Sequence, residues 1–217
     1  MWKNLRVLSL ICFVLPVITV IISYIISVKL NLVTSCIPNL EGCTSISRAG
    51  RYIPVKYFFK PMMYLYAVIL FLFWYNFLEQ LKYFKIVENK IFWFATFSVL
   101  FLILYITFLG EGKIYNFFRR IGIYIYIFFT ILTQFLLSKK LYTMKDKIKK
   151  IYNFKFIKIN YLLTFFLVIS GIILLPILIV KIDSFPQIKN IISWNYFILI
   201  QLYFFFSFFY FKKTNFR

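Results

Sequence analysis

The stretch Val7–Val28, VLSLICFVLPVITVIISYIISV, decides the fold, because it runs for 22 residues without a charged side chain. A helix rises about 1.5 Å per residue, so this length spans the roughly 30 Å hydrocarbon core of a membrane. A secretory signal peptide begins in a similar way, but its apolar region is shorter and ends in a small-residue cleavage site. Ser27-Val28-Lys29 does not fit such a site. We therefore predict an uncleaved membrane anchor.

Five further stretches of the 217-residue chain are long and apolar, and 63% of all residues are hydrophobic. Soluble domains are nearer to about half apolar, so the excess is expected to face lipid. No Asp, Glu, Lys or Arg lies inside any of these stretches. The sequence predicts an all-α polytopic membrane protein with a single transmembrane domain over residues 1–217. Its six predicted spans are residues 7–28, 61–78, 91–109, 121–138, 161–180 and 191–211, with an earlier start at Ile114 as the alternative for the fourth.

The basic residues divide unequally between two sets of connecting segments. Segments 1–6, 79–90, 139–160 and 212–217 carry 16 of the 26 Lys and Arg residues, and segments 29–60, 110–120 and 181–190 carry 10. Short loops rich in Lys and Arg stay on the cytoplasmic side of a membrane. We therefore predict that both termini are cytoplasmic and that loops 29–60 and 110–120 face outward, most simply from a bacterial inner membrane. Loop 139–160 is interpreted as the topology anchor, with binding of anionic lipid as the alternative.

Two cysteines lie in the predicted outer loop, where the compartment oxidises thiols. Cys36 and Cys43 have six residues between them, including Pro38 and Gly42, which help the chain to turn back. This placement predicts a Cys36–Cys43 disulfide, with two free thiols as the alternative. The third cysteine, Cys12, lies in the first span and is interpreted as a small hydrophobic residue.

Several chemistries have no support in the composition. The chain contains no histidine, no CxxC motif and no cluster of carboxylates, so we predict neither a metal site nor a cofactor. Phosphate-binding glycine motifs are absent as well. A formal charge of +20 would suggest nucleic acid in a soluble protein. Here the cationic loops flank apolar spans, so we expect membrane lipids with anionic headgroups as partners and no nucleic acid.

Arginine is concentrated in the predicted outer loops. Only six of the basic residues are Arg, and four of those fall in the two outer loops. Arginine differs from lysine in its bidentate grip on phosphate or carboxylate. A phosphate-binding cluster is one interpretation; pairing of the arginines with Glu41 and Glu111, or contact with headgroups in general, is the other. The candidate ligand-binding residues are Ser45, Ser47, Arg48, Arg51, Glu111, Arg119 and Arg120.

The segment Ile46-Ser47-x-x-Gly50-x-x-x-Pro54, followed by the second span, resembles the first outer loop of the FRAG–DRAM–SFK-type six-span membrane proteins. Phe58 and Phe59 match the aromatic position near the helix start, and Gly110–Gly122 is similar to the family's later glycine-led loop. The family's histidine before the fourth span and the acidic residue after the proline are missing from this chain. The resemblance implies a role in lipid remodelling, phospholipid asymmetry or autophagy, and no single reaction.

Three functions are compatible with these features. The favoured hypothesis is a non-catalytic membrane protein that recognises a lipid headgroup or assists a protein partner in handling lipid. The alternative is a lipid-modifying enzyme, an acyl or phosphoryl transferase, with Glu111, Glu41 or Lys113 as its base, although no catalytic constellation is present. A small transporter is the third. The spans also hold scattered polar side chains, and we predict that most of them bond one helix to another. These are Ser23, Asn76, Thr96, Ser98, Thr130, Thr133, Gln134, Thr164, Ser170, Asn195, Gln201 and Ser207.

Overall fold

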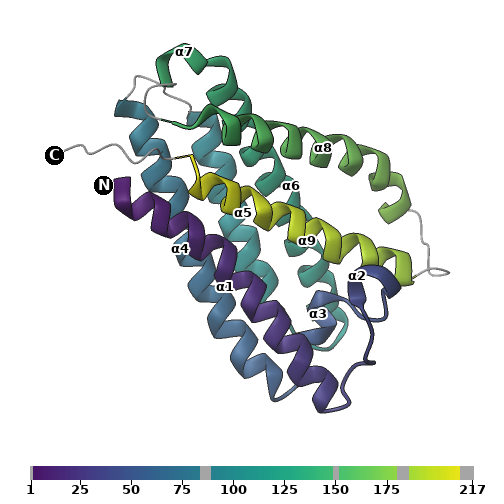
Figure 1. The fold of residues 1–217 in the computed structure, drawn as a ribbon. Helices are drawn as coiled ribbons and strands as arrows, with labels where there is room; N and C mark the ends of the chain where they lie inside the picture. Colours follow the sequence, from purple (N-terminus) through teal and green to yellow (C-terminus); the bar gives the residue numbers. More distant parts are fainter. Residues whose placement is uncertain (1, 84–88, 149–151, 180–185, 211–217) are drawn as a thin grey trace.

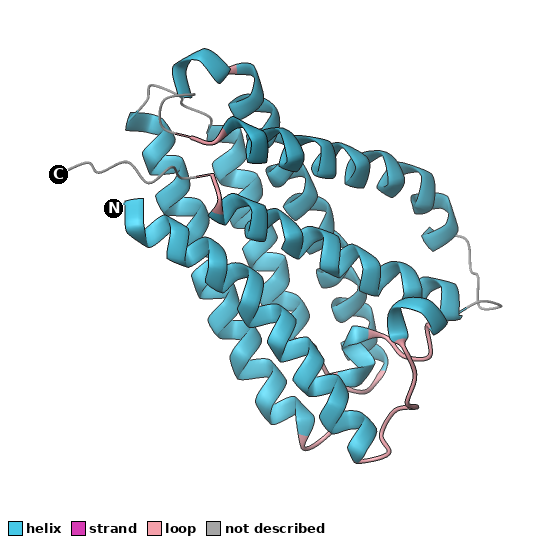
Figure 2. Ribbon diagram, in the orientation of Figure 1, coloured by secondary structure: helices cyan, strands magenta, loops and turns pink. Residues whose placement is uncertain are grey.

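The computed structural model describes residues 2–83, 89–148, 152–179 and 186–210, and the elements in that part of the chain are helices (Figure 2). Six are long and apolar enough to cross a membrane, which confirms the predicted six-span, all-α class. They are α1 (Trp2–Lys29), α4 (Val55–Tyr83), α5 (Asn89–Thr107), α6 (Lys113–Thr143), α8 (Phe154–Ile179) and α9 (Pro186–Phe208). The short helices are α2 (Pro38–Glu41), α3 (Ile46–Ala49) and α7 (Lys145–Ile148).

The six long helices form a ring that follows chain order. Each long helix packs against the next one along the chain, and α9 closes the ring by packing against α1 (Figure 1). Inside the ring, aromatic side chains of α4 meet those of α9: Phe73 lies 5.3 Å from Phe204, and Trp74 lies 6.2 Å from Tyr203, between ring centroids. These side chains are almost fully buried, so the centre of the bundle is an aromatic core.

The first helix begins and the last helix ends at the same end of the bundle. The Arg6 guanidinium lies 4.4 Å from the ring centroid of Phe208, and the Ser9 hydroxyl donates to the Phe204 carbonyl at 2.6 Å. The opposite end, called the loop end from here on, carries α2, α3 and the turn between α5 and α6 (Figure 1). Thus the two loops predicted to share one side of the membrane do lie at one end of the fold.

The helices begin or end a few residues away from the predicted limits of the spans. Helix α4 begins at Val55 rather than at residue 61, and α8 begins at Phe154 rather than at 161. Helix α6 covers 31 residues, about 46 Å of rise against a hydrocarbon core of about 30 Å. Apolar content marks only the part of a helix in hydrocarbon, whereas the backbone hydrogen bonds continue into the interface. The predicted outer loop of residues 29–60 is shorter for the same reason, and it contains α2 and α3. Residues 180 and 211, the predicted ends of two spans, lie outside the described residues.

Helices α5 and α9 differ from prediction in the other direction at their C-termini. Helix α5 ends at Thr107 and α9 at Phe208, although the apolar sequence continues beyond both. In α5, the last regular bond runs from the Phe108 amide to the Leu104 carbonyl, and the chain then turns at Gly110 toward α6. The turn, and not a change in apolarity, therefore ends this helix.

The prediction for polar side chains inside the spans is right for the internal glutamines and wrong for most hydroxyl groups. Gln134 donates to the carbonyl of Ile200 at 3.2 Å, and Gln201 donates to the Tyr66 hydroxyl at 3.4 Å, so both cross between helices. The hydroxyls instead donate to a carbonyl three or four residues earlier in their own helix, as threonine and serine commonly do. This holds for Thr96, Ser98, Thr130, Thr133 and Thr164. Ser170 and Ser207 bond to their own helix as well, but they confirm the prediction because each also accepts from a second helix, Ser170 from the Tyr196 hydroxyl at 2.7 Å and Ser207 from the Asn160 amide nitrogen at 3.1 Å.

Candidate functional site

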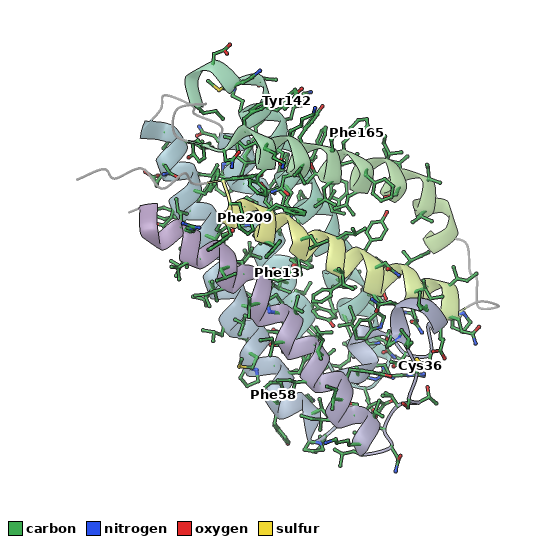
Figure 3. The ribbon with its side chains drawn as sticks, viewed as in Figure 1. Phe13, Cys36, Phe58, Tyr142, Phe165 and Phe209 are labelled. Carbon is green, nitrogen blue, oxygen red and sulfur yellow. A yellow bond between two sulfur atoms is a disulfide. The ribbon has the colours of Figure 1, made fainter. Side chains whose placement is uncertain are left out.

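A disulfide closes the loop that follows α1. Cys36 and Cys43 are bonded, with their Cα atoms 6.4 Å apart, as predicted from their spacing. Figure 3 labels Cys36 in this loop, close to the first turn of α9. Between the two cysteines lies α2, which ends at Gly42 with a φ of +66°, a backbone conformation that favours glycine. The Glu41 carboxylate accepts a bond from the Ile37 amide at 2.9 Å, so it caps this short turn.

Four hydrogen bonds fix this loop to the helices beside it. Trp194 on α9 donates its Nε1 to the Thr44 carbonyl at 2.9 Å, and Asn190 donates to the Gly42 carbonyl at 2.8 Å. On α1, the Tyr24 hydroxyl donates to the Cys36 carbonyl at 2.7 Å, and the Ser27 hydroxyl donates to the Ala49 carbonyl at 2.6 Å. The loop is therefore a fixed platform and not a free tether.

Helix α3 carries the segment that was predicted to bind a ligand. Its N-cap is Ser45, whose side chain accepts a bond from the Arg48 amide at 3.2 Å. This capping role uses the Ser45 oxygen as an acceptor and leaves its O–H group to donate, so the predicted contact of Ser45 with a headgroup stays a prediction. The Ser47 side chain instead points into the bundle, where its hydroxyl lies within hydrogen-bonding range of the Tyr105 hydroxyl on α5. Of the two serines, Ser47 is the one whose hydroxyl lies at the cluster described next.

Arg119 is the centre of the candidate site. It lies in the second turn of α6 and is only 9% exposed. Its Nη1 donates to the Gly110 carbonyl at 3.0 Å, and its Nη2 donates to Asn116 Oδ1 at 2.7 Å. Both partners are neutral: Gly110 belongs to the turn that joins α5 to α6, and Asn116 belongs to the first turn of α6. The guanidinium is thus held in a defined orientation without a counter-charge.

A second guanidinium, that of Arg51, lies close enough to Arg119 for the two charges to repel each other. Arg51 Nη2 donates to the Tyr52 hydroxyl at 3.3 Å, and its Cζ lies 5.2 Å from the centroid of the same ring. Its Nε is buried and makes no hydrogen bond. One donor of this guanidinium is therefore unused at the point where the outer loop meets α6.

No carboxylate neutralises these two arginines within the residues that the structure describes. In that part of the chain, the ion pair that forms is between Lys82 and Glu79, which lie in α4 near the end opposite the loop end. Glu41 and Glu111, the partners considered from the sequence, form no ion pair with an arginine in the described chain. Arg51 and Arg119 consequently form a positive pair that keeps an unused hydrogen-bond donor. The neutral hydroxyls of Ser47, Tyr52 and Tyr105 border this pair.

The other predicted site residues lie at the surface of the same end. Arg48, Arg120 and Glu111 are exposed, and only Arg120 is within electrostatic range of Arg119. Glu111 occupies the turn before Gly112, whose φ of +113° also favours glycine. Nothing in the described chain orients the Glu111 carboxylate toward a nucleophile, so the geometry adds no support to the enzyme hypothesis.

Large apolar side chains are exposed at the same end of the bundle as the arginine pair. In the first two turns of α6, Ile114 is 68% exposed, Phe117 is 61% exposed and Phe118 is 37% exposed. Tyr57, at the start of α4, is 70% exposed. Aromatic and apolar residues beside basic ones are typical of the interface between hydrocarbon and headgroups. The loop end therefore combines buried and exposed arginines with exposed apolar side chains.

Comparisons of the chain with protein-family models, with curated proteins and with solved structures find no match. The class that the structure defines is a multi-pass membrane protein with six apolar helices. The resemblance of the Ile46–Pro54 segment to the FRAG–DRAM–SFK-type proteins thus depends on the motif and the span pattern alone and stays a prediction.

Three contributors to the site were missed in the sequence. Tyr52, Tyr105 and Asn116 orient or border the two guanidiniums, yet none of them was a candidate. Tyr52 adjoins Arg51 and Asn116 lies three residues before Arg119, which is the spacing of neighbours on one face of a helix. That spacing was the available signal for Asn116. Tyr105 had no such signal, because it comes from α5 and reaches the site only through helix packing.

Proposed function

We propose that this protein recognises a phosphate-bearing lipid headgroup at the loop end of its bundle and acts without catalysis, either alone or as an accessory to a membrane partner. The observation that carries the proposal is the buried Arg119 guanidinium beside Arg51, with no carboxylate paired to either in the described chain. The proposed ligand is an anion, because two like charges held together with spare donors are stabilised by a group that accepts from both.

Burial makes this need for an anion substantial. An ionised side chain loses several kcal/mol of hydration on burial unless a counter-charge or strong hydrogen bonds replace it. Arg119 keeps two bonds to neutral acceptors, which offset part of that loss. A phosphate accepts bidentate bonds from a guanidinium, and such charge-assisted bonds are about twice as strong as neutral ones. Arg51 Nε supplies an unused donor for it.

The exposed apolar residues at the loop end, which are Tyr57, Ile114, Phe117 and Phe118, favour a lipid over a free anion as the ligand. A soluble phosphate would gain nothing from Phe117 and Ile114, whereas the acyl chains of a lipid would lie against them. Distribution of Lys and Arg supports an orientation with the loop end outward, and the Cys36–Cys43 disulfide agrees with an oxidising compartment on that side. On this proposal the headgroup belongs to the outer leaflet of a bacterial inner membrane.

Native mass spectrometry of the protein extracted with its lipids tests the proposal. The test variant is Arg51→Lys/Arg119→Lys, which keeps the charge and removes the bidentate fork. The matched control is Arg48→Lys/Arg120→Lys, which makes the same change at two exposed arginines of the same end. Losing one or two charge-assisted bonds weakens binding by roughly tenfold to a hundredfold.

The expected result is an anionic phospholipid that is retained by the wild type and by the control and is lost from the test variant. Inorganic phosphate added at increasing concentration should not displace that lipid if the exposed apolar residues at the loop end contribute to binding. Identical lipid profiles for all three proteins would overturn the headgroup site. Equal losses in the test variant and the control would show nonspecific attraction to charge and would overturn it too.

A further inference from the structure

A second group of polar side chains is buried inside the bundle. Gln134 on α6, Asn160 on α8 and Gln201 on α9 are each at most 1% exposed. In all three, the amide nitrogen donates a hydrogen bond: Gln134 to the Ile200 carbonyl at 3.2 Å, Asn160 to the Tyr203 carbonyl at 2.9 Å, and Gln201 to the Tyr66 hydroxyl at 3.4 Å. In all three, the amide oxygen accepts none.

The orientation of two of these amides is fixed by their partners. Gln134 and Asn160 face backbone carbonyls, which only accept hydrogen bonds, so rotating either amide by half a turn would place two acceptors against each other. The unused oxygens of Gln134 and Asn160 are therefore a property of the packing and not of the choice between nitrogen and oxygen in each side chain.

Unused acceptors of this kind are costly. A buried polar group without a partner has lost the hydrogen bonds to water that it makes in the unfolded chain, so each unused oxygen destabilises the fold until a donor reaches it. Several hydroxyls in these helices are already engaged. Thr130 donates to the Tyr126 carbonyl at 2.7 Å, Thr164 donates to the Asn160 carbonyl at 2.8 Å, and the Tyr210 hydroxyl accepts from the Asn160 amide nitrogen at 2.7 Å. The three amide oxygens are therefore open to a further donor.

Two hydroxyls complete the lining of this region. Ser138 on α6 and Tyr203 on α9 are fully buried and lie beside each other without an aligned hydrogen bond. Ser138 lies four residues after Gln134 on the same face of α6, about 6 Å further along its axis. The unused groups thus extend along the bundle and are not gathered around one point.

We propose that internal water molecules bind here, bridging the amide oxygens of Gln134, Asn160 and Gln201 to the hydroxyls of Ser138 and Tyr203. Water is the smallest uncharged donor, and a buried water usually makes two to four hydrogen bonds of this sort. A bare cation would find only neutral acceptors, because all six Asp and Glu residues lie outside the predicted spans. The ring of helices therefore encloses a hydrated polar stretch beside its aromatic core.

X-ray radiolytic footprinting of the protein in lipid nanodiscs tests this inference. Radiolysis of a bound water oxidises the side chains next to it, so burial alone does not protect them. Tyr203 is the reporter, and Phe73, which is equally buried among aromatic rings, is the dry reference in the same molecule. We expect Tyr203 to be oxidised several-fold faster than Phe73.

Two conservative variants sharpen the result. Ser138→Ala removes one bridging hydroxyl and should lower the oxidation rate of Tyr203. Thr133→Val removes a hydroxyl that is equally buried on α6 but bonded to its own helix, and it should leave the rate unchanged. Oxidation of Tyr203 as slow as that of Phe73 in the wild type would overturn the inference, whatever the variants do. An equal effect of both variants would also overturn it, because it would report loosened packing in place of a lost water site.

Discussion

Gly122 is the point where α5 and α6 approach each other most tightly, and its replacement by alanine is the sharpest test of the packing. A Cβ at this position would lie 2.8 Å from the backbone nitrogen of Tyr105, 3.0 Å from its Cα and 3.1 Å from the carbonyl oxygen of Phe101. All three are backbone atoms of α5, so no side chain can rotate away. The two helices themselves must separate by about 0.6 Å to restore an ordinary contact of 3.4 Å.

The expected magnitude follows from two opposing effects. Alanine is favoured over glycine in a helix interior by about 1 kcal/mol, whereas forcing one extra carbon into a close-packed contact costs about 1–3 kcal/mol. Gly171→Ala is a matched control, because a Cβ there would meet only the Tyr196 hydroxyl at an unstrained 3.9 Å. The helix-propensity gain is common to both variants, so their difference isolates the packing cost. We expect Gly122→Ala to be less stable than Gly171→Ala by about 1–3 kcal/mol.

Reversible unfolding of both variants in mixed micelles, followed by tryptophan fluorescence, measures this difference. The separation of α5 from α6 should also displace Tyr105 from the arginine pair, so lipid retention should fall in Gly122→Ala and not in Gly171→Ala. Equal stabilities, or a more stable Gly122→Ala, would refute the close approach of the two helices.

Two further predictions concern the loop platform. Replacing Cys36 and Cys43 by serine should destabilise the protein by about 2 kcal/mol, because the disulfide closes a short loop in the unfolded chain. A reductant should therefore lower the melting temperature of the wild type and leave that of this variant unchanged. A wild-type melting temperature that does not respond to the reductant would contradict this prediction. Trp194→Phe removes the hydrogen bond to the Thr44 carbonyl, so it should destabilise the protein by about 1 kcal/mol and speed hydrogen exchange in α3. The control Trp93→Phe, at an exposed position of α5, should change neither quantity. Unchanged exchange in α3 of the Trp194→Phe variant would show that this bond does not hold the platform.

The six spans could be predicted because each is a long run without charge, and no backbone structure other than a helix is stable for such a run in lipid. The lengths of the helices could not. Helix α6 begins at Lys113, beside the alternative start at Ile114, and its second turn includes Arg119 and Arg120, whose charges interrupt the apolar run from which the span was predicted. The ring order was also beyond the sequence, since the spans are apolar on every side and do not indicate which face meets a neighbour.

The candidate site shows the same division. Topology alone places the two arginine-bearing loops at one end, and that prediction needs only an even number of spans between them. It does not distinguish Arg119 from Arg120, which are adjacent in sequence and differ completely in burial. Their difference is set by α6: Arg119 is three residues before Gly122 and shares its face, so the close contact with α5 that the glycine allows also turns Arg119 inward.

The internal amides carry this reasoning one step further. An amide in a span is predicted to join two helices, and Gln134, Asn160 and Gln201 each do so through the nitrogen. The sequence does not predict a partner for the amide oxygen. Every backbone N–H group in a helix interior already donates within its own helix, so the backbone of a neighbouring helix offers the oxygen no donor. Carbonyl oxygens of the backbone, in contrast, accept a second bond. Glutamine and asparagine packed between helices therefore satisfy their donors easily and their acceptors only through a hydroxyl or a water, and that asymmetry is the physical origin of the hydrated stretch proposed for this bundle.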